Sequence, residues 1–339
     1  MSRCRTEIVA VNTAPITGPI VVSGGAGAIG SRLVHRLLER DATTVVVVDD
    51  LSSGYEWLLP SDRRVRLLRR DVCELLDIDL VIDEPLVFHL AAFFANQNSV
   101  DHPLDDLRTN GLGTLTALTW AVRHRARRFV YASAGCSIAG HDLDGPIRED
   151  MPVSMHLDTP YQITKALGEF YCNYFGSQQL ETVRCRFFNC YGPGEVPGRY
   201  RNVVPNFVWR ALHSDPLIIT GTGDETRDFI YVDDLVDGLL AGAQTPSARG
   251  EAFNLGTGCP TRIIDLAEMV IKACRSTSRI EFGQRRSWDR SWHREADNSK
   301  ARRVLAFAPE VSMREGIQRT VDWFVENRTA IEEAVRARP

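Results

Sequence analysis

The chain has 339 residues, of which 44% are hydrophobic and 25% are charged. This length and composition are typical of a globular protein with one large or two smaller domains, and they exclude a disordered, collagen-like or low-complexity chain. The 40 Lys and Arg residues are balanced by 44 Asp and Glu residues, which gives a formal net charge of −4. No global positive field therefore recruits nucleic acid or an anionic membrane, and we expect neither as a partner.

The eight cysteines show no CxxC pair and no framework spacing, which predicts reduced thiols in a cytoplasmic protein. The N-terminal residues have no apolar core typical of a signal peptide, and no stretch approaches the roughly 18 apolar residues of a membrane span. The eight histidines form no HxH or HExxH cluster, so we expect no metal and interpret His89 as a packed, hydrogen-bonded residue.

Alternating strands and helices predict an α/β protein. Residues 19–23 form a short apolar run that is followed by the turn GGAGAIG, a helix over 31–40, and a β-branched strand over 43–50. This is a βαβ opening. The alternation then continues through strands at 65–68, 86–92, 129–133 and 182–188 and a helical stretch at 103–124. The pattern predicts a doubly wound Rossmann-type parallel sheet.

The residue composition changes near residue 190, where a loop rich in Gly, Pro and Arg precedes a helix at 203–213. This change predicts a second, smaller α/β domain. The segments 226–243 and 252–255 are regular enough to return to the large sheet, so the two domains are expected to interleave. We predict a first domain over 15–189 with returns at 226–255, and a second over 190–225 and 256–330.

The glycine turn carries the spacing of a dinucleotide-binding loop. Gly25-x-Gly27-x-x-Gly30 lies between a strand and a helix, and Gly24 adds a GxxGxxG spacing on the same turn. Without a Cβ these residues let a pyrophosphate approach the helix N-terminal amides. Asp49 follows Gly30 by 19 residues, which is near the spacing expected for the acid that binds the adenosine ribose. The adjacent Asp50 favours NAD, because two acids would repel the 2′-phosphate of NADP.

A tyrosine and a lysine stand one helical turn apart at Tyr161 and Lys165. The ammonium group lowers the pKa of the phenol by charge proximity, so Tyr161 can take a proton from a substrate hydroxyl while a hydride leaves for the nicotinamide. The pair alone is a weak motif, but behind a dinucleotide fingerprint it indicates a dehydrogenase-type site.

From about residue 18 to 308 the chain resembles an extended short-chain dehydrogenase/reductase of the nucleotide-sugar epimerase, dehydratase and decarboxylase group. The segments that carry the resemblance are SGGAGAIG, VDDLSSG, RRDV at 69–72, FHLAA at 88–92, TNGLGT at 109–114, PYQITKALGE at 160–169, RFFNCYGPGE at 186–195, TRDFIYVDD at 226–234 and ADNSKA at 296–301.

The resemblance implies that NAD is the cofactor and that the first domain binds it. The implied cofactor-binding residues are Gly24, Gly27, Ala28, Ile29, Gly30, Asp49, Asp50, Ser53, Gly54, Asp71, Val72, Leu90, Ala91, Ala92, Asn110, Tyr161, Lys165 and Phe188. Among these, Asp49 is expected at the adenosine ribose, Asp71 with Val72 at the adenine edge, and Tyr161 with Lys165 at the nicotinamide ribose.

The resemblance also implies that the second domain binds a nucleotide-diphosphate sugar. The implied substrate residues are Asn189, Asn202, Val203, Arg227, Arg286 and Arg199. Guanidinium forks and side-chain amides suit a dianionic diphosphate. For Arg227 an ion pair with Asp224, Asp228 or Asp233 is the alternative, and Arg285 or Arg290 could replace Arg286 as the second phosphate contact.

The segment after the strand at 129–133 departs from the group's pattern. Ungapped alignment puts Ala134 at the position of the usual catalytic hydroxyl, and Gly135 and Cys136 where 4,6-dehydratases have an acid pair. A dehydratase is therefore a poor fit. A shift of one residue would bring Ser133, Cys136 or Ser137 to the sugar, so the catalytic candidates are Tyr161, Lys165, Ser133 and Cys136.

Three functions remain open from the sequence. A UDP-glucuronate decarboxylase, giving UDP-4-keto-pentose or UDP-xylose, is narrowly preferred. A 4-keto glucuronate loses CO2 readily, so the site needs little more than a residue that binds the carboxylate. Arg199 and Arg201 are the candidates for this residue. The alternative is a UDP-sugar 4-epimerase of the UDP-glucose/UDP-galactose type. A non-catalytic NAD-sensing module is less favoured, since Tyr161 and Lys165 are intact. The resemblance also implies a homodimer paired through helices near 103–124 and 161–180.

Overall fold

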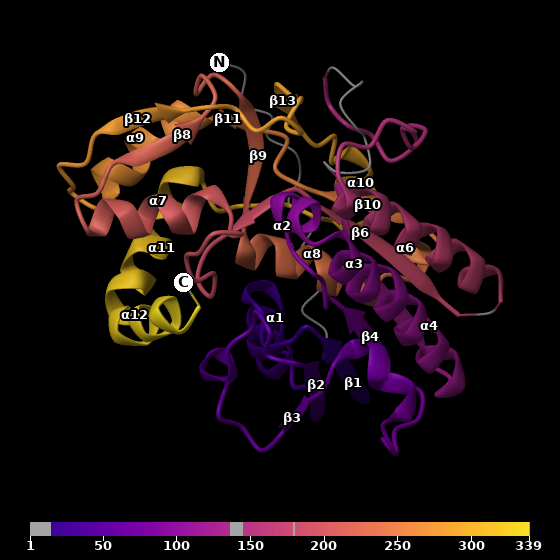
Figure 1. Cartoon of the computed structure of the whole chain (residues 1–339). Helices are drawn as coiled ribbons and strands as arrows, with labels where there is room; N and C mark the ends of the chain where they lie inside the picture. The colour runs from indigo at the N-terminus through magenta and orange to yellow at the C-terminus, as the bar shows by residue number, and fades with distance from the viewer. Residues whose placement is uncertain (1–14, 136–144, 179, 339) are drawn as a thin grey trace.

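A seven-stranded parallel sheet organises the larger part of the molecule (Figure 1). The structure is a computed structural model that describes residues 15–135, 145–178 and 180–338. In spatial order the strands are β10 (Ala252–Leu255), β6 (Thr182–Phe187), β5 (Arg128–Ala134), β4 (Leu86–His89), β1 (Pro19–Ser23), β2 (Thr44–Asp49) and β3 (Val65–Arg69), and every neighbouring pair is parallel. The strands predicted from 19 to 188 all lie in this sheet, which confirms the doubly wound fold.

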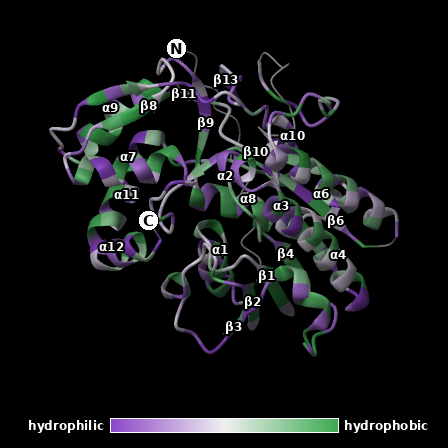
Figure 2. Cartoon of the chain, viewed as in Figure 1, coloured by the Kyte–Doolittle hydropathy of each residue, from purple (hydrophilic) through white to green (hydrophobic). Residues whose placement is uncertain are grey.

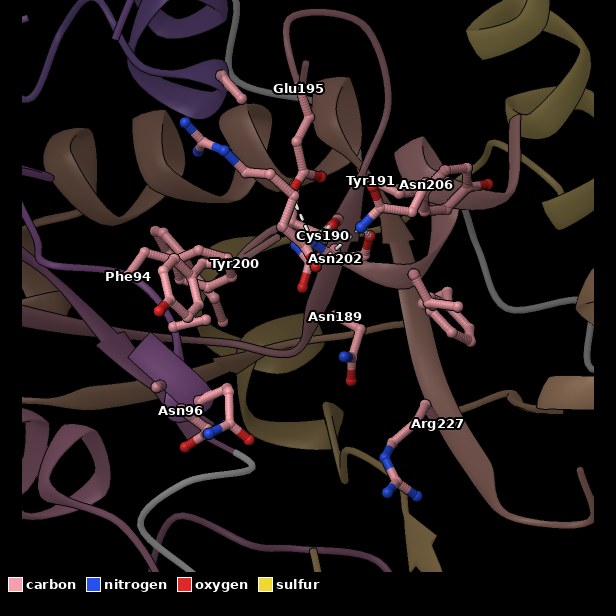
Figure 3. A pocket seen from close by; sticks show the side chains of 18 of the residues that line it. Phe94, Asn96, Asn189, Cys190, Tyr191, Glu195, Tyr200, Asn202, Asn206 and Arg227 are labelled. Carbon is pink, nitrogen blue, oxygen red and sulfur yellow. Dashed lines mark hydrogen bonds between the residues drawn. The ribbon is translucent and has the colours of Figure 1, made fainter. Parts of the chain in front are cut away.

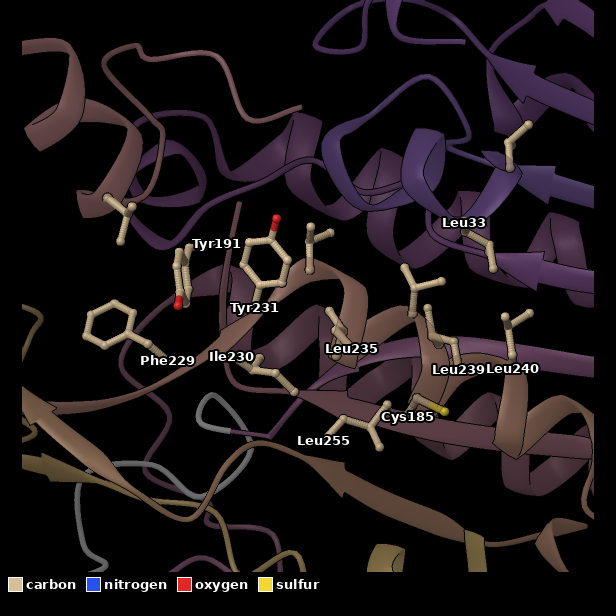
Figure 4. Packing of buried hydrophobic residues seen from close by; sticks show 14 of the residues in the cluster. Leu33, Cys185, Tyr191, Phe229, Ile230, Tyr231, Leu235, Leu239, Leu240 and Leu255 are labelled. Atoms are coloured by element: carbon tan, nitrogen blue, oxygen red, sulfur yellow. The ribbon is translucent and has the colours of Figure 1, made fainter. Parts of the chain in front are cut away.

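Helices cover both faces of the sheet, because alternate strand residues point to opposite sides. Val22 and Val47 belong to the core beneath α1 (Ala28–Glu39) and α8 (Val232–Gln244), to which Leu33 of α1 and Leu239 of α8 also belong (Figure 4). Val21 and Val46 pack on the other face, beneath α4 (Gly113–Arg123) and α6 (Pro160–Ser177). Hydrophobic and hydrophilic residues alternate along these covering helices (Figure 2).

The predicted helical stretch at 103–124 forms as three successive pieces. α3 (Pro103–Asp106) leads into a π-helical stretch at Leu107–Leu112, and α4 continues from Gly113. The short helix α2 (Asn96–Asp101) precedes them, and 3-10 turns lie at Glu56–Leu58, Val72–Asp77 and Pro246–Ala248. No helix in the part of the chain that the structure describes is long and apolar enough to cross a membrane.

A second region lies beyond the carboxyl ends of the large sheet, at the upper left of Figure 1. Its strands are β7 (Asn189–Tyr191), β9 (Thr226–Tyr231), β11 (Pro260–Arg262) and β13 (His293–Arg294) in one small sheet, and β8 (Leu217–Thr220) with β12 (Ile280–Gly283) in a parallel pair. Its helices are α7 (Val203–Leu212), α9 (Ile263–Ala273), α11 (Met313–Glu326) and α12 (Arg328–Ala337), and α10 (Ser299–Leu305) packs near β10 and α8.

The prediction that 226–243 and 252–255 both return to the large sheet was half right. β10 pairs with β6 in that sheet, and α8 packs against β5 and β6. The strand β9, however, pairs with β7, β11 and β13 in the second region. A strand in the large sheet is buried on both faces, whereas β9 begins with the polar residues Thr226, Arg227 and Asp228. The domain division itself stays a prediction.

Candidate active site

A cavity of about 720 Å³ separates the large sheet from the second region. Its walls include the glycine turn after β1, the loop after β4, the end of β5, and residues of β7, β9 and β13. The strand order of the large sheet reverses between β1 and β4, so the cavity lies at the topological switch point where doubly wound sheets bind ligands.

The glycine turn has the shape of a nucleotide cradle. A Cβ on Gly30 would lie 2.1 Å from the Gly24 carbonyl oxygen, and a Cβ on Gly24, at φ +73°, would lie 2.5 Å from the Ala91 nitrogen. Gly27 is the N-cap of α1 and lines the cavity, and the first turn of α1 has neither a side-chain cap nor an acidic residue. The helix amides are therefore open to a pyrophosphate, and the turn fits NAD.

Asp49 lies behind this turn. Its carboxylate accepts hydrogen bonds from the backbone amides of Ala26 and Leu51, each at 2.9 Å, and burial raises its pKa. Gly54 packs on Ala26, where a Cβ would come within 2.8 Å of the backbone. Among the predicted residues of this loop only Ser53 lines the cavity, so Asp49, Asp50 and Gly54 hold or border the turn.

Four further predicted cofactor residues also lie outside the cavity lining: Asp71, Val72, Ala91 and Asn110. Asp71 caps the 3-10 turn after β3 by accepting from the Cys73 amide at 2.8 Å, and it pairs with Arg108 at 2.7 Å. The buried amide of Asn110 bonds both the N–H and the C=O of Phe93, so it fixes the loop after β4 rather than facing the cavity. Leu90, Ala92 and Phe188 do line it.

Tyr161 and Lys165 lie on one face of α6 and both line the cavity. The helix starts there because Thr159 accepts a hydrogen bond from the Gln162 amide and Pro160 stands in the first turn. The Lys165 ammonium donates to the Ala132 carbonyl at 2.9 Å and lies 5.7 Å from the centroid of the Tyr161 ring. Burial lowers the pKa of Lys165 to about 8, against the opposing effect of Asp106.

Ser133 lines the cavity, but its hydroxyl is already engaged. It donates to Glu169 at 2.6 Å, and the same buried carboxylate receives two hydrogen bonds from Arg186 at 2.9 Å. Ala134 presents only a methyl group to the cavity. Cys136 and Ser137, the other hydroxyl or thiol candidates, lie outside the described residues.

The six predicted substrate residues all line the cavity: Asn189, Asn202, Val203, Arg227, Arg286 and Arg199. Asn189 and Arg227 project into it from β7 and β9, across from Asn96 (Figure 3). The side-chain oxygen of Asn189 is buried and has no hydrogen-bond partner within the described part of the chain, so it is available to a ligand donor.

Arg227 forms an ion pair with a residue that the sequence did not suggest. Its guanidinium bonds both carboxylate oxygens of Asp289, at 2.9 and 3.0 Å. The alternative partners expected from the sequence were Asp224, Asp228 and Asp233. Of these, Asp228 accepts hydrogen bonds from the backbone amides of Thr257, Gly258 and Ala296.

The other candidate arginines differ in placement. Arg199 is largely exposed and pairs with Asp101 at the end of α2, at 3.3 Å. Arg201 donates to the Ser53 carbonyl at 2.7 Å, so it lies toward the cofactor loop. Arg286 lines the cavity above the Trp288 ring. Arg285 and Arg290 do not line it.

The sequence reasoning missed several cavity residues, among them Asn96, Glu195, Tyr200, Asp289 and Arg294. Burial raises the pKa of the Glu195 carboxyl, which accepts from the Asn202 amide. Nothing in the local sequence marks Arg294, whose place at the cavity follows from the pairing of β13 with β9.

His89, expected to be a packed residue, is fully buried and hydrogen-bonds Ser23 and Thr114 at 2.7 and 3.0 Å. Burial lowers its pKa to about 3, so it stays neutral. Within the described ranges no group of three or more His, Cys, Asp or Glu side chains could hold a metal ion.

Known proteins resemble this chain over nearly its whole length. It is 36% identical over 310 residues to the UDP-glucose 4-epimerase of Mycolicibacterium smegmatis, covering 90% of this chain and 97% of that one. It is 33% identical to UDP-glucuronic acid decarboxylase 1 of Arabidopsis thaliana, covering 90% of this chain and 69% of that one.

Solved structures also resemble this chain over nearly its whole length. An epimerase from Methanothermobacter thermautotrophicus has a TM-score of 0.90 and 43% identity, covering 94% of this chain and 95% of that one. The Bordetella bronchiseptica enzyme WbmF in complex with NAD+ has a TM-score of 0.81 and 36% identity, covering 94% and 96%. Residues 20–256 match the description "NAD dependent epimerase/dehydratase family". The chain belongs to this family of NAD-dependent nucleotide-sugar epimerases, dehydratases and decarboxylases, and it is an enzyme of that class.

Proposed function

We propose that this protein is a UDP-sugar 4-epimerase that inverts a hexose at C4 through a 4-keto intermediate. One observation carries the proposal: Tyr161 and Lys165 share a single cavity with Arg227 and Arg286. A diphosphate held by the two arginines would leave its sugar beside the phenol. The similarity to the UDP-glucose 4-epimerase of Mycolicibacterium smegmatis extends over 97% of that protein, which also supports this choice.

The chemistry that NAD supplies when bound is reversible hydride acceptance. The part of Tyr161 is to take the proton from the C4 hydroxyl as the hydride leaves, and to give that proton back to the C4 oxygen afterwards. The positive charge of Lys165 favours the phenolate. Because one tyrosine can serve both proton transfers, the methyl group of Ala134 does not prevent epimerisation.

The decarboxylase preferred from the sequence is the second candidate. It is favoured by the engagement of the Ser133 hydroxyl with Glu169, since decarboxylation of a 4-keto uronate needs no second proton donor on this strand. The Arabidopsis decarboxylase relative supports it more weakly, because only 69% of that protein is matched.

Analysis of the reaction products distinguishes the epimerase from the decarboxylase. The purified enzyme is incubated with NAD and either UDP-glucose or UDP-glucuronate, and the products are resolved by mass and by sugar-isomer chromatography. Isomers of unchanged mass support the epimerase. A UDP-pentose lighter than UDP-glucuronate by one CO2 overturns it in favour of the decarboxylase. The Tyr161→Phe variant should lose about 10²- to 10⁴-fold in rate. Tyr174→Phe, on an exposed part of the same helix, is the matched control.

A further inference from the structure

Arg294 is a buried arginine that lines the cavity. It ends β13, where it stands in register with Arg227 of β9, and it is 8% exposed. No hydrogen bond or ion pair joins its side chain to any residue that the structure describes. The neighbouring Arg227, by contrast, is paired with Asp289.

This arrangement points to a ligand. A largely buried guanidinium has lost part of its hydration, which costs free energy unless a carboxylate, a phosphate or carbonyl oxygens replace it. Arg199, Arg201 and Arg210 all have such partners within the protein. Arg294 has none among the residues that the structure describes, so its guanidinium suits an anionic group of a bound ligand.

Two anions of a nucleotide sugar could fill this role, the diphosphate and a carboxylate on the sugar. The position of Arg294 favours the sugar. Ala296, two residues on and therefore about 7 Å away along an extended chain, packs against Phe188 and Ile147. Phe188 lines the same cavity as Tyr161 and Ser133, so this face borders the end where the sugar reacts.

We propose that Arg294 binds a carboxylate on the hexose, which makes the substrate a UDP-hexuronate such as UDP-glucuronate. A planar carboxylate matches the guanidinium fork with two parallel hydrogen bonds. The inference rests on the proposed function, and it holds for either epimerisation or decarboxylation of the uronate.

The test measures binding to the NAD-loaded enzyme in a Tyr161→Phe background, so that ligands bind without turning over. UDP, UDP-glucose and UDP-glucuronate are titrated by calorimetry into this protein and into versions that also carry Arg294→Gln or Arg294→Lys. Arg279→Gln, an exposed arginine outside the cavity, is the matched control. Thermal melts of each variant establish that it folds.

We expect Arg294→Gln to weaken UDP-glucuronate binding about 10- to 100-fold, the effect of losing a charge-assisted bidentate contact. Binding of UDP and UDP-glucose should not change, and Arg294→Lys should recover part of the loss. Equal weakening of all three ligands would overturn the proposal and assign Arg294 to the diphosphate.

The turnover results keep the two proposals separate. Conversion of UDP-glucose together with an Arg294→Gln variant that binds UDP-glucuronate normally would overturn the carboxylate site and leave the epimerase standing. No conversion of either sugar, together with a selective loss of UDP-glucuronate binding, would support the carboxylate site and reject the epimerase.

Discussion

Lys165 combines full burial with a charge that the proposed chemistry needs. Its pKa is lowered to about 8 by burial, whereas an unfolded lysine titrates near 10.4. Between these two values the unfolded chain binds a proton that the folded protein does not. The free energy of unfolding should therefore rise with pH over this window, by about 1.4 kcal/mol for each unit of pKa difference.

The check compares the enzyme with Lys165→Met, both stripped of bound nucleotide, by urea unfolding from pH 7 to 9.5. The difference between the two free energies of unfolding at each pH isolates the contribution of Lys165. Above pH 8 this difference should increase in favour of the wild-type enzyme. A difference that stays flat across this range would mean that Lys165 keeps its proton and that its pKa is not lowered.

The ion pair between Asp289 and Arg227 allows a test of the proposed diphosphate site. A diphosphate that binds Arg227 must displace or share the two hydrogen bonds from Asp289. Asp289→Asn removes the opposing charge, so we expect tighter UDP binding, while Arg227→Gln should weaken it by about 10-fold or more. Calorimetric titration with UDP measures both. If Asp289→Asn instead weakened UDP binding, the pair would serve to position Arg227.

Local spacing was enough to find some site residues but not others. Tyr161 and Lys165 belong to one helical turn, so their shared face follows from four residues of separation. The partner of Arg227 lies 62 residues along the chain, and the choice of Asp289 over the nearer acids depends on how the small sheet pairs. The engagement of Ser133 with Glu169 is likewise a contact between a strand and a helix that spacing alone does not reveal.

The glycine turn offers a matched pair of substitutions at the scale of one element. A Cβ on Gly30 would strike backbone at 2.1 Å, whereas a Cβ on Gly27 meets only the Gly24 oxygen, at 3.3 Å, and otherwise points into the cradle. We expect Gly30→Ala to lower the melting temperature and abolish NAD binding. Gly27→Ala should fold with a near-normal melting temperature and bind NAD more weakly. Equal melting temperatures for both variants would contradict this difference in strain.

The helices predicted to pair in a homodimer carry an exposed apolar surface. On α6 it includes Ile163, Phe170 and Tyr174, each more than half exposed, and on the neighbouring stretch it includes Leu104 and Leu107. Apolar surface of this kind is typical of an interface. We expect a dimer at micromolar concentration by light scattering, and a monomer for Phe170→Glu.

Phe282→Glu is the control for this change, because Phe282 is equally exposed but lies on β12 in the second region. A wild-type monomer, or dissociation by both variants, would reject the predicted helix pairing.

Hydrophobic runs predicted the elements of the large sheet because buried parallel strands are apolar on both faces. β10 follows this rule and was recognised at 252–255 even though it is separated from its neighbour β6 by the second region. β9 and β13 were not assignable in this way. Their polar residues face the cavity, and the pairing of such short strands is decided by contacts remote in sequence.

At the scale of the whole molecule, one hydrophobic core joins the two regions. It runs from Val22 and Val47 of the large sheet to Phe207, Leu266 and Ile317 of the second region. α8 is tied to α1 by ion pairs of Asp233 and Asp237 with arginines. At the C-terminus, Arg338 donates to the Leu51 and Gly54 carbonyls beside the cofactor turn.

A shared core should make the protein unfold as a single cooperative unit, although the chain weaves two regions together. Calorimetry should therefore show one transition. The expected binding residues of NAD and of UDP lie on opposite walls of the cavity. Each ligand should nevertheless raise the temperature of the same transition, because a ligand at 100 times its Kd adds about 2.7 kcal/mol to the free energy of unfolding of the unit that binds it. Two transitions, one moved by NAD and the other by UDP, would show instead that the regions are separate folding units and that the core between them contributes little.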